Sequence, residues 1–207
     1  QVPEKDQKVM PKVAEATQGE NCLLGAAAET DYRTLTATAQ AYGHKLIALA
    51  PCDINKTKQV NILITDMGYP LENIVVYPTT AALGYGMEYI YSILERGRLA
   101  ALSGDRLLAQ PVILDAGYEA WRAKEAKAGD EFADAWGPAR ERGPAWEAVT
   151  ATTLLQGGAD LLVMCHPKAV EAVRNAIGQL VGAKATFPIQ DTDLPLLQTT
   201  LSQGAAR

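Results

Sequence analysis

Polar and small residues follow each short apolar run of this sequence, and their types could do chemistry. They include a carboxylate and an amide at Asp53 and Asn55, neighbouring hydroxyls at Thr79 and Thr80, and the imidazole of His166. Such groups bond the polar edge of a ligand or partner, and a histidine can also act as a general base. The residues that we expect to face a ligand or partner are Asp53, Asn55, Thr79, Thr80, Gly84, Tyr85, Gly86, Glu119, Trp121 and His166.

Each of these residues also has an ordinary structural role open to it. Asp53 precedes a helical stretch and is most simply its N-cap, and Thr79 and Thr80 could cap the next helix. The turn at residues 84–86 either relieves crowding or lets a ligand or partner approach the backbone closely. For His166 a hydrogen-bonding role is favoured over catalysis, so no catalytic residue is assigned.

Several chemistries lack the residues that they need. The cysteines Cys22, Cys52 and Cys165 form no Cys-x-x-Cys pair, so they cannot hold an iron–sulfur cluster unaided. The two histidines, His44 and His166, lie far apart in the sequence, so no metal site is predicted. The phosphate-binding glycine loops and the G-x-S-x-G nucleophile turn are also missing from the sequence.

The elements that must position these residues alternate along the chain. Near-continuous apolar runs, typical of buried parallel strands, lie near 22–28, 45–50, 73–77, 111–114 and 160–165. Helical stretches precede, separate and follow them, and the polar stretch 128–143 is predicted to be an extended loop. This alternation predicts an α/β fold with a parallel sheet in a single domain over 1–207, in which 183–207 forms a C-terminal extension.

Two architectures suit this order, an open doubly wound sheet and part of a (β/α)₈ barrel. In both, the functional loops follow the carboxyl ends of the strands. The first strand spacings are close to the ~31 residues of a (β/α)₈ repeat, but a whole barrel takes ~250 residues and the chain has 207. Five βα units cannot close such a barrel. The strand count alone therefore leaves both architectures open.

Composition excludes several classes of partner. Lys and Arg total 19 and Asp and Glu total 24, which gives a net charge of −5 with the basic residues scattered. Nucleic acid and anionic membrane surfaces are therefore not expected partners.

The sequence also bears on location. There is no apolar run long enough to span a membrane and no signal peptide, and the first residue, Gln1, indicates a processed or excised piece. The three widely spaced cysteines favour a reducing, cytoplasmic location.

Five sequence blocks carry a resemblance to one family. They are PTTAALGYGMEY at 78–89, YSILERGRLAAL at 91–102 with Gly104-Asp105, EAWRAKE at 119–125, RGPAWEAVTA at 142–151 and GADLLVMCHP at 158–167. Over about residues 4–182 the chain resembles the delta subunit of the acetyl-CoA decarbonylase/synthase complex, which is equivalent to the small subunit of the corrinoid iron–sulfur protein. The resemblance implies a (β/α)₈ barrel related to pterin-binding methyltransferases. We therefore expect this chain to hold the last five units of a TIM-type barrel with exposed sheet edges, and the family barrel implies three more units before Cys22.

The resemblance also implies a function, that of a non-catalytic scaffold which covers a corrinoid. The partner is the large, or gamma, subunit, which carries the corrinoid (cobalamin) and a [4Fe–4S] cluster, so this chain alone holds no cofactor. The heterodimer moves a methyl group from methyltetrahydropterin or methyltetrahydrofolate, through cobalt, to acetyl-CoA synthase in one-carbon metabolism. The methyltransferase and acetyl-CoA synthase components are then further partners.

Two alternatives remain open, and the chain departs from the family at several positions. The chain could be a methyltransferase that binds a pterin itself, with Asp53 and Asn55 as the candidate pair, or a truncated relative without activity. Ala81 stands where the family leads us to expect glycine, Cys165 stands where it leads us to expect arginine, and Ala116 and Tyr118 are also unusual for the family in their loop. If that arginine grips the partner or an anionic group, Cys165 weakens the contact.

Overall fold

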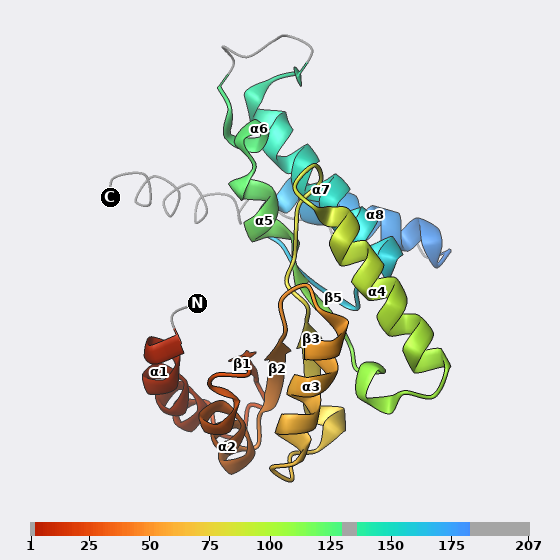
Figure 1. Ribbon diagram of the computed structural model, residues 1–207. Helices are drawn as coiled ribbons and strands as arrows, with labels where there is room; N and C mark the ends of the chain where they lie inside the picture. Colours follow the sequence, from red (N-terminus) through yellow and green to blue (C-terminus); the bar gives the residue numbers. More distant parts are fainter. Residues whose placement is uncertain (1–2, 130–135, 183–207) are drawn as a thin grey trace.

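The computed structural model describes residues 3–129 and 136–182, in which helices and parallel strands alternate (Figure 1). The predicted extension at 183–207 lies outside these residues. The strands are β1 (Leu23–Ala27), β2 (Lys45–Leu49), β3 (Ile74–Tyr77), β4 (Ile113–Asp115) and β5 (Leu161–Val163). The helices are α1 (Pro3–Ala16), α2 (Tyr32–Tyr42), α3 (Ile54–Thr65), α4 (Met87–Leu102), α5 (Ala116–Arg122), α6 (Lys124–Lys127), α7 (Ala139–Gly157) and α8 (Pro167–Leu180).

The five predicted strands are confirmed, and their spatial order follows the chain. β1, β2 and β3 form one parallel sheet, and β4 pairs in parallel with β5. A parallel bridge between Val76 and Val112 joins the two sheets. A doubly wound sheet reverses its strand order at a switch point, whereas a (β/α)₈ barrel does not. The observed order therefore favours part of a barrel over the open doubly wound sheet.

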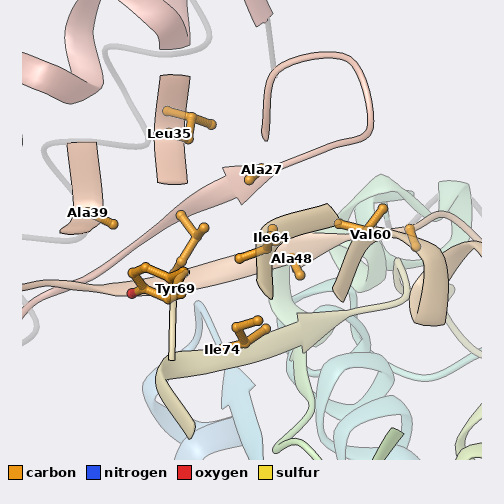
Figure 2. Packing of buried hydrophobic residues seen from close by; sticks show 10 residues of the cluster. Ala27, Leu35, Ala39, Ala48, Val60, Ile64, Tyr69 and Ile74 are labelled. Atoms are coloured by element: carbon orange, nitrogen blue, oxygen red, sulfur yellow. The ribbon is translucent and has the colours of Figure 1, made fainter. Parts of the chain in front are cut away.

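Side chains alternate between the two faces of this curved sheet. Leu46 and Ala48 of β2 face the helices, whereas Ile47 and Leu49 face the concave side. Figure 2 shows the core between β1–β3 and the helices α2 and α3, where Leu35, Val60, Ile64, Tyr69 and Ile74 also pack. A second core lies between β4, β5 and the helices α4, α7 and α8, and includes Ile90, Leu114, Leu154 and Val173.

The concave face of β5 is open to solvent. Leu161 and Val163 are paired in register with Ile113 and Asp115 of β4, so they lie on the same face as these residues. Their exposed fractions are 43% and 44%, whereas Leu114 on the helix-covered face is 0% exposed. Within the described ranges β5 pairs with a strand on one side only. This open edge is what five units of an eight-unit barrel would leave.

Residues 130–135 of the predicted extended loop at 128–143 lie outside the described residues. The last part of this prediction is wrong, because α7 begins at Ala139. The Gly143-Pro144 pair, which usually breaks helices, lies inside α7 and is buried. A Cβ atom at Gly143 would overlap the ring of Trp121, so the helix packs closely against α5 at this point. Tertiary packing here overrides the low helix propensity of glycine and proline.

A buried histidine attaches α1 to the sheet. The Nδ1 atom of His44 accepts a hydrogen bond from the Cys22 backbone N–H at 3.1 Å, and its Nε2 donates to the Ala14 carbonyl at 2.8 Å. The Tyr69 hydroxyl donates to the His44 carbonyl at 2.6 Å. Both ring nitrogens are therefore used, and the imidazole is 2% exposed.

Replacing His44 with alanine is expected to lower the free energy of unfolding by about 2–3 kcal/mol, because the substitution leaves a buried N–H and a buried carbonyl without partners. Urea denaturation followed by circular dichroism measures the change. Gln40→Ala, at an exposed position of α2, is the control and should change stability by less than about 0.5 kcal/mol. An equal effect of the two substitutions would contradict the assigned role.

Candidate functional site

The loops that follow the strands meet at one end of the sheet. The Ala50 N–H donates to the Tyr77 carbonyl at 3.1 Å, and the Cys52 N–H donates to the Pro78 carbonyl at 3.0 Å. These bonds place the loop after β2 beside the loop after β3. The carboxyl ends of parallel strands collect binding and catalytic groups in α/β folds, so this end of the sheet is the candidate site.

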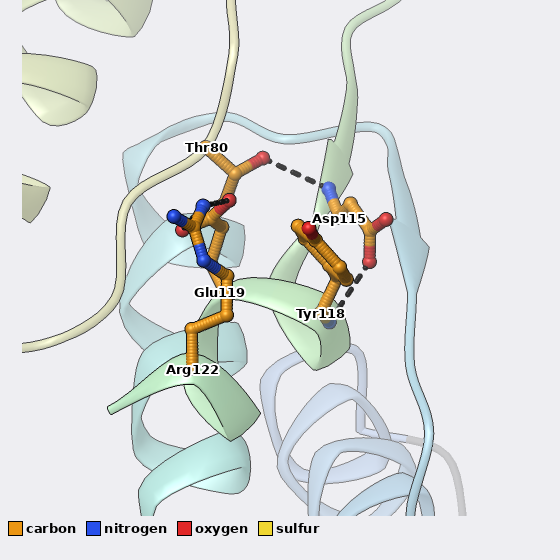
Figure 3. A network of polar contacts seen from close by, with 5 residues as sticks. All are labelled: Thr80, Asp115, Tyr118, Glu119 and Arg122. Atoms are coloured by element: carbon orange, nitrogen blue, oxygen red, sulfur yellow. Dashed lines mark hydrogen bonds and ion pairs between the residues drawn. The ribbon is translucent and has the colours of Figure 1, made fainter. Parts of the chain in front are cut away.

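A polar network connects the loop after β3 with the start of α5 (Figure 3). The Thr80 hydroxyl accepts from the Asp115 backbone N–H at 2.9 Å, and Asp115 Oδ1 accepts from the Tyr118 N–H at 3.0 Å. Glu119 pairs with Arg122 at 3.0 Å, and the Arg122 guanidinium lies 5.4 Å from the centroid of the Tyr118 ring. Asp115 is thus the N-cap of α5.

A concave pocket of about 570 Å³ lies beside this network. Its floor is apolar, with Ile47, Leu49, Ile113 and Val163, whereas its upper wall carries polar groups. The polar-capable residues that line it are Tyr77, Thr79, Asp115 and Tyr118.

The phenol of Tyr77 stays protonated at neutral pH. Burial raises its pKa above the usual 10, a hydrogen bond with Thr80 partly offsets this rise, and the negative charges of Asp115 and Glu119 add to it. A protonated phenol, a hydroxyl and a carboxylate together offer donors and acceptors over an apolar floor, which is typical of small-ligand sites.

Thr79 has a backbone conformation that β-branched residues rarely adopt. Its φ is +72°, in the left-handed region. Its Oγ1 atom is buried and has no hydrogen-bond partner among the described residues. The expectation that Thr79 and Thr80 cap the following helix is wrong, because α4 begins at Met87 and Gly86 is its N-cap. A strained residue with an unpaired hydroxyl at a strand end is a feature of functional sites.

Thr79→Gly is expected to stabilise the protein by about 1 kcal/mol, because glycine adopts a positive φ without steric cost. Thr79→Ala removes the same hydroxyl but keeps a Cβ atom, so its gain should be clearly smaller. Parallel urea titrations of the two variants measure the difference. If Thr79→Gly is no more stable than Thr79→Ala, the strain is not present.

Asp53 is the N-cap of α3, as its structural interpretation predicted. Its Oδ1 accepts from the backbone N–H groups of Asn55 at 2.8 Å and Lys56 at 3.2 Å. The Asn55 side chain is exposed at the start of the helix. Neither residue lines the concave pocket, although Pro51 of the same loop does.

The turn that contains Tyr85 lies against α6 and not in the concave pocket. Gly84 and Gly86 have φ values of +77° and +96°, so the turn itself requires glycine at both positions. The Tyr85 hydroxyl donates to Glu125 at 2.7 Å and accepts from the Lys124 N–H at 3.2 Å. The hydrogen bond from Tyr85 is the main cause of the lowered pKa of Glu125.

Sequence reasoning gave no role to Glu147, which is fully buried on α7. Its carboxylate accepts from the Trp121 indole N–H at 2.6 Å, from the Cys165 N–H at 2.6 Å and from the His166 N–H at 3.1 Å. It precedes the apolar-stripe residues Thr150, Ala151 and Leu154 by three, four and seven positions. A charged residue on a buried helical stripe is the signal that could have identified it.

Trp121 and His166 lie together beside this carboxylate. Their rings are stacked with centroids 5.9 Å apart, and both side chains are partly exposed. The Nδ1 atom of His166 accepts from the Lys168 N–H at 3.2 Å, so His166 is the N-cap of α8. The hydrogen-bonding role expected for His166 is therefore present.

Cys165 occupies the position where the family led us to expect arginine. It lies against Gly117, where an added Cβ would come within 2.7 Å of the Cys165 Sγ. Burial, followed by the charges of Glu147 and Asp115, raises the pKa of its thiol. Among the described residues no three His, Cys, Asp or Glu side chains form a group that could hold a metal ion.

These features define a class of protein: parallel βα units arranged in chain order, with polar loops at the carboxyl ends, form part of a (β/α) barrel. The fold is similar to that of a solved Yersinia pestis DHPS in complex with a pterine-sulfa conjugate, with a TM-score of 0.52 and 14% identity. The similarity covers 85% of this chain and 66% of that one. Residues 2–173 match the family described as CO dehydrogenase/acetyl-CoA synthase delta subunit, and the chain belongs to this family.

Curated relatives agree with the family match. The chain is 42% identical to the acetyl-CoA decarbonylase/synthase complex subunit delta of Methanopyrus kandleri over 193 residues, which cover 93% of this chain and 47% of that protein. It is 39% identical to the delta subunit of Archaeoglobus fulgidus, over 91% of this chain and 42% of that protein. The chain therefore spans about half the length of these relatives. None of the described helices is long and apolar enough to cross a membrane.

Proposed function

We propose that this chain is the barrel portion of a delta subunit that acts as a scaffold for a corrinoid carried by a large subunit. Family membership supports this proposal, and the observation that carries it is the carboxyl-end rim. The rim presents the exposed Tyr118 ring beside the Asp115 carboxylate. The large subunit, acetyl-CoA synthase and the methyltransferase component are the proposed partners.

The chemistry of the rim fits such a cofactor. A corrinoid is broad and largely apolar with amide side chains, and its cobalt supplies the methyl-carrying centre. The exposed face of Tyr118 suits the apolar ring system. The Asp115 carboxylate, which caps α5 through Oδ1, can also accept from an amide N–H. In this proposal the chain binds and shields the cofactor, and its residues transfer no group themselves.

Tyr118→Ala tests which surface binds. Because Tyr118 is 58% exposed at the rim, its truncation should weaken binding of the corrinoid-loaded large subunit about tenfold, the cost of about 1.4 kcal/mol at an aromatic anchor. Calorimetric titration of the full chain measures the affinity. Tyr89→Ala is the matched control, because Tyr89 is 67% exposed on α4 and does not line the concave pocket. An equal effect of both substitutions would exclude the rim as the binding surface.

A second candidate function, binding of a pterin by this chain alone, is favoured by the concave pocket. Asp53 does not line this pocket, whereas Asp115 lines it with Tyr77 and Thr79. A carboxylate beside hydroxyl groups can pair with the N–H and carbonyl edge of such a ring. Calorimetry with methyltetrahydrofolate separates the two functions, because micromolar binding to the isolated chain supports the enzyme and no binding supports the scaffold.

A further inference from the structure

One ring nitrogen of the His166 imidazole forms a hydrogen bond within the described residues, and the other forms none. Nδ1 accepts from the Lys168 backbone N–H at 3.2 Å, so in the neutral ring the proton must be on Nε2. Nε2 forms no hydrogen bond to any residue that the structure describes. The ring therefore carries a single free donor, at the end of the sheet where the loops meet.

The direction of this donor is set by the ring's surroundings. One face of the imidazole stacks on Trp121 at 5.9 Å with an interplanar angle of 24°. The Trp121 indole N–H in turn donates to Glu147, which also accepts from the backbone N–H of His166 itself. The space that a Cβ atom would occupy at Gly143 is filled by the Trp121 ring. The backbone and one face of His166 are thus held through a single buried carboxylate.

The charged groups around His166 come from two helices, α7 and α8. Burial is the largest influence on the ring and disfavours its protonated form, as does Lys168 of α8, whereas Glu147 and Glu141 of α7 favour it. Lys168 is itself paired with Glu141 at 2.9 Å. The pKa of His166 is consequently lowered from its usual 6.5, and the ring is neutral at neutral pH.

We propose that Glu147 is a positioning residue that holds the Nε2–H donor of His166 toward an amide carbonyl oxygen of the bound partner. The inference rests on the proposed scaffold function and names a contact of that same rim. The carbonyl oxygen that accepts this hydrogen bond belongs either to an amide side chain of the corrin or to the backbone of the large subunit. Binding of the corrinoid-loaded and corrinoid-free forms of that subunit distinguishes them.

The positioning step is tested by NMR of the full chain, which contains only two histidines. At pH 7.5 the long-range nitrogen spectrum should show His166 with its proton on Nε2, and the ring should titrate below pH 6.5. In Glu147→Gln the side-chain oxygen cannot accept from all three N–H donors, and its own NH₂ group opposes them. The amide of Cys165 should then exchange at least tenfold faster, and the His166 ring should become a mixture of tautomers.

Glu141→Gln is the matched control, because it removes an equal charge near His166 without touching the three donors. It should leave the tautomer and the Cys165 amide unchanged, and His44 serves as an internal reference in every variant. If Glu147→Gln leaves the tautomer and amide exchange as in the wild type, or if Glu141→Gln changes them equally, Glu147 does not position the ring.

The donor step is tested with two amide substitutions at residue 166. An asparagine can still accept from the Lys168 N–H but has no group at the Nε2 position, whereas a glutamine amide reaches that position. His166→Asn should therefore bind the large subunit at least tenfold more weakly, and His166→Gln should recover most of the affinity. A loss only with the corrinoid-loaded form assigns the acceptor to the corrin, and a loss with both forms assigns it to the protein.

Unchanged affinity of His166→Asn for both forms overturns the donor role. If the wild-type chain binds neither form, the proposed scaffold function fails and the acceptor assignment fails with it. The NMR experiment is independent of any partner, so it still decides whether Glu147 holds the ring.

Discussion

Glu147→Ala is expected to lower the free energy of unfolding by about 3–4 kcal/mol, one of the larger effects available to a single substitution in this chain. The carboxylate is 0% exposed and accepts hydrogen bonds from Trp121, Cys165 and His166. Its removal leaves an indole N–H and two backbone N–H groups without acceptors, and each unsatisfied buried donor costs about 1–3 kcal/mol. Urea denaturation monitored by tryptophan fluorescence measures the change.

The control for this prediction is Glu141→Ala, six residues earlier on α7. The Glu141 side chain is 46% exposed and forms an ion pair with Lys168. A solvated ion pair of this kind contributes little, so the control should change stability by less than about 1 kcal/mol. A change below about 1 kcal/mol for Glu147→Ala as well would show that the carboxylate does not hold α5 and the loop after β5 together.

The open edge at β5 should cause the isolated chain to self-associate, and Leu161→Lys combined with Val163→Lys should weaken that association more than tenfold. These two side chains are 43% and 44% exposed on the concave face, and parallel strands are normally covered on both faces. Because neither residue belongs to the buried core, the double substitution should alter stability by less than about 1 kcal/mol. Sedimentation velocity over a range of concentrations measures the association.

The matched control places the same charges on a different exposed apolar surface. Leu99 and Leu102 of α4 are 57% and 78% exposed, so replacing both with lysine gives an equal change in charge. This control should leave the association constant within about threefold of the wild type. Two results would show that the chain does not associate through β5. One is a wild-type chain that stays monomeric, and the other is a control variant that weakens the association as much as the double substitution in β5.

The strands were predictable because their signal is local. Runs such as 45–50 and 73–77 are almost wholly apolar, as parallel strands covered on both faces must be, and β2 and β3 lie within these runs. The N-cap role of Asp53 was predictable for the same reason, since an acidic residue directly before a helix satisfies the first N–H groups.

The parts that could not be predicted depend on contacts between distant segments. The start of α7 at Ala139 depends on the packing of Gly143 against Trp121, which no property of 139–145 alone reveals. The placement of Trp121 likewise depends on Glu147, 26 residues later. Trp121 was expected to face a ligand or partner, but the bond from its indole N–H to a buried carboxylate and the stacking of its ring on His166 were not predicted.

In the candidate site, too, local features were predicted and contacts between distant segments were not. The loops after the strands were expected to form a polar rim, and Thr80, Asp115 and Glu119 do lie in one network there (Figure 3). The concave pocket was not predicted, because it combines residues of β1, β2, β3, β4 and β5. The positive φ of Thr79 and its unpaired hydroxyl were not predicted either. Sequence spacing places residues at the end of a strand but does not say which way a loop turns them.

The most direct test of the scaffold proposal is whether this chain forms a complex with a corrinoid-carrying large subunit. The purified full chain and the large subunit are mixed at about 10 µM each, near the concentrations at which micromolar interfaces form, and separated by size-exclusion chromatography with light scattering. The Methanopyrus kandleri delta subunit, mixed with the same large subunit, serves as the positive control. A 1:1 complex with a Kd in the micromolar range or tighter is the predicted result. Separate elution of the two proteins, under conditions in which the control pair co-elutes, would contradict the proposal.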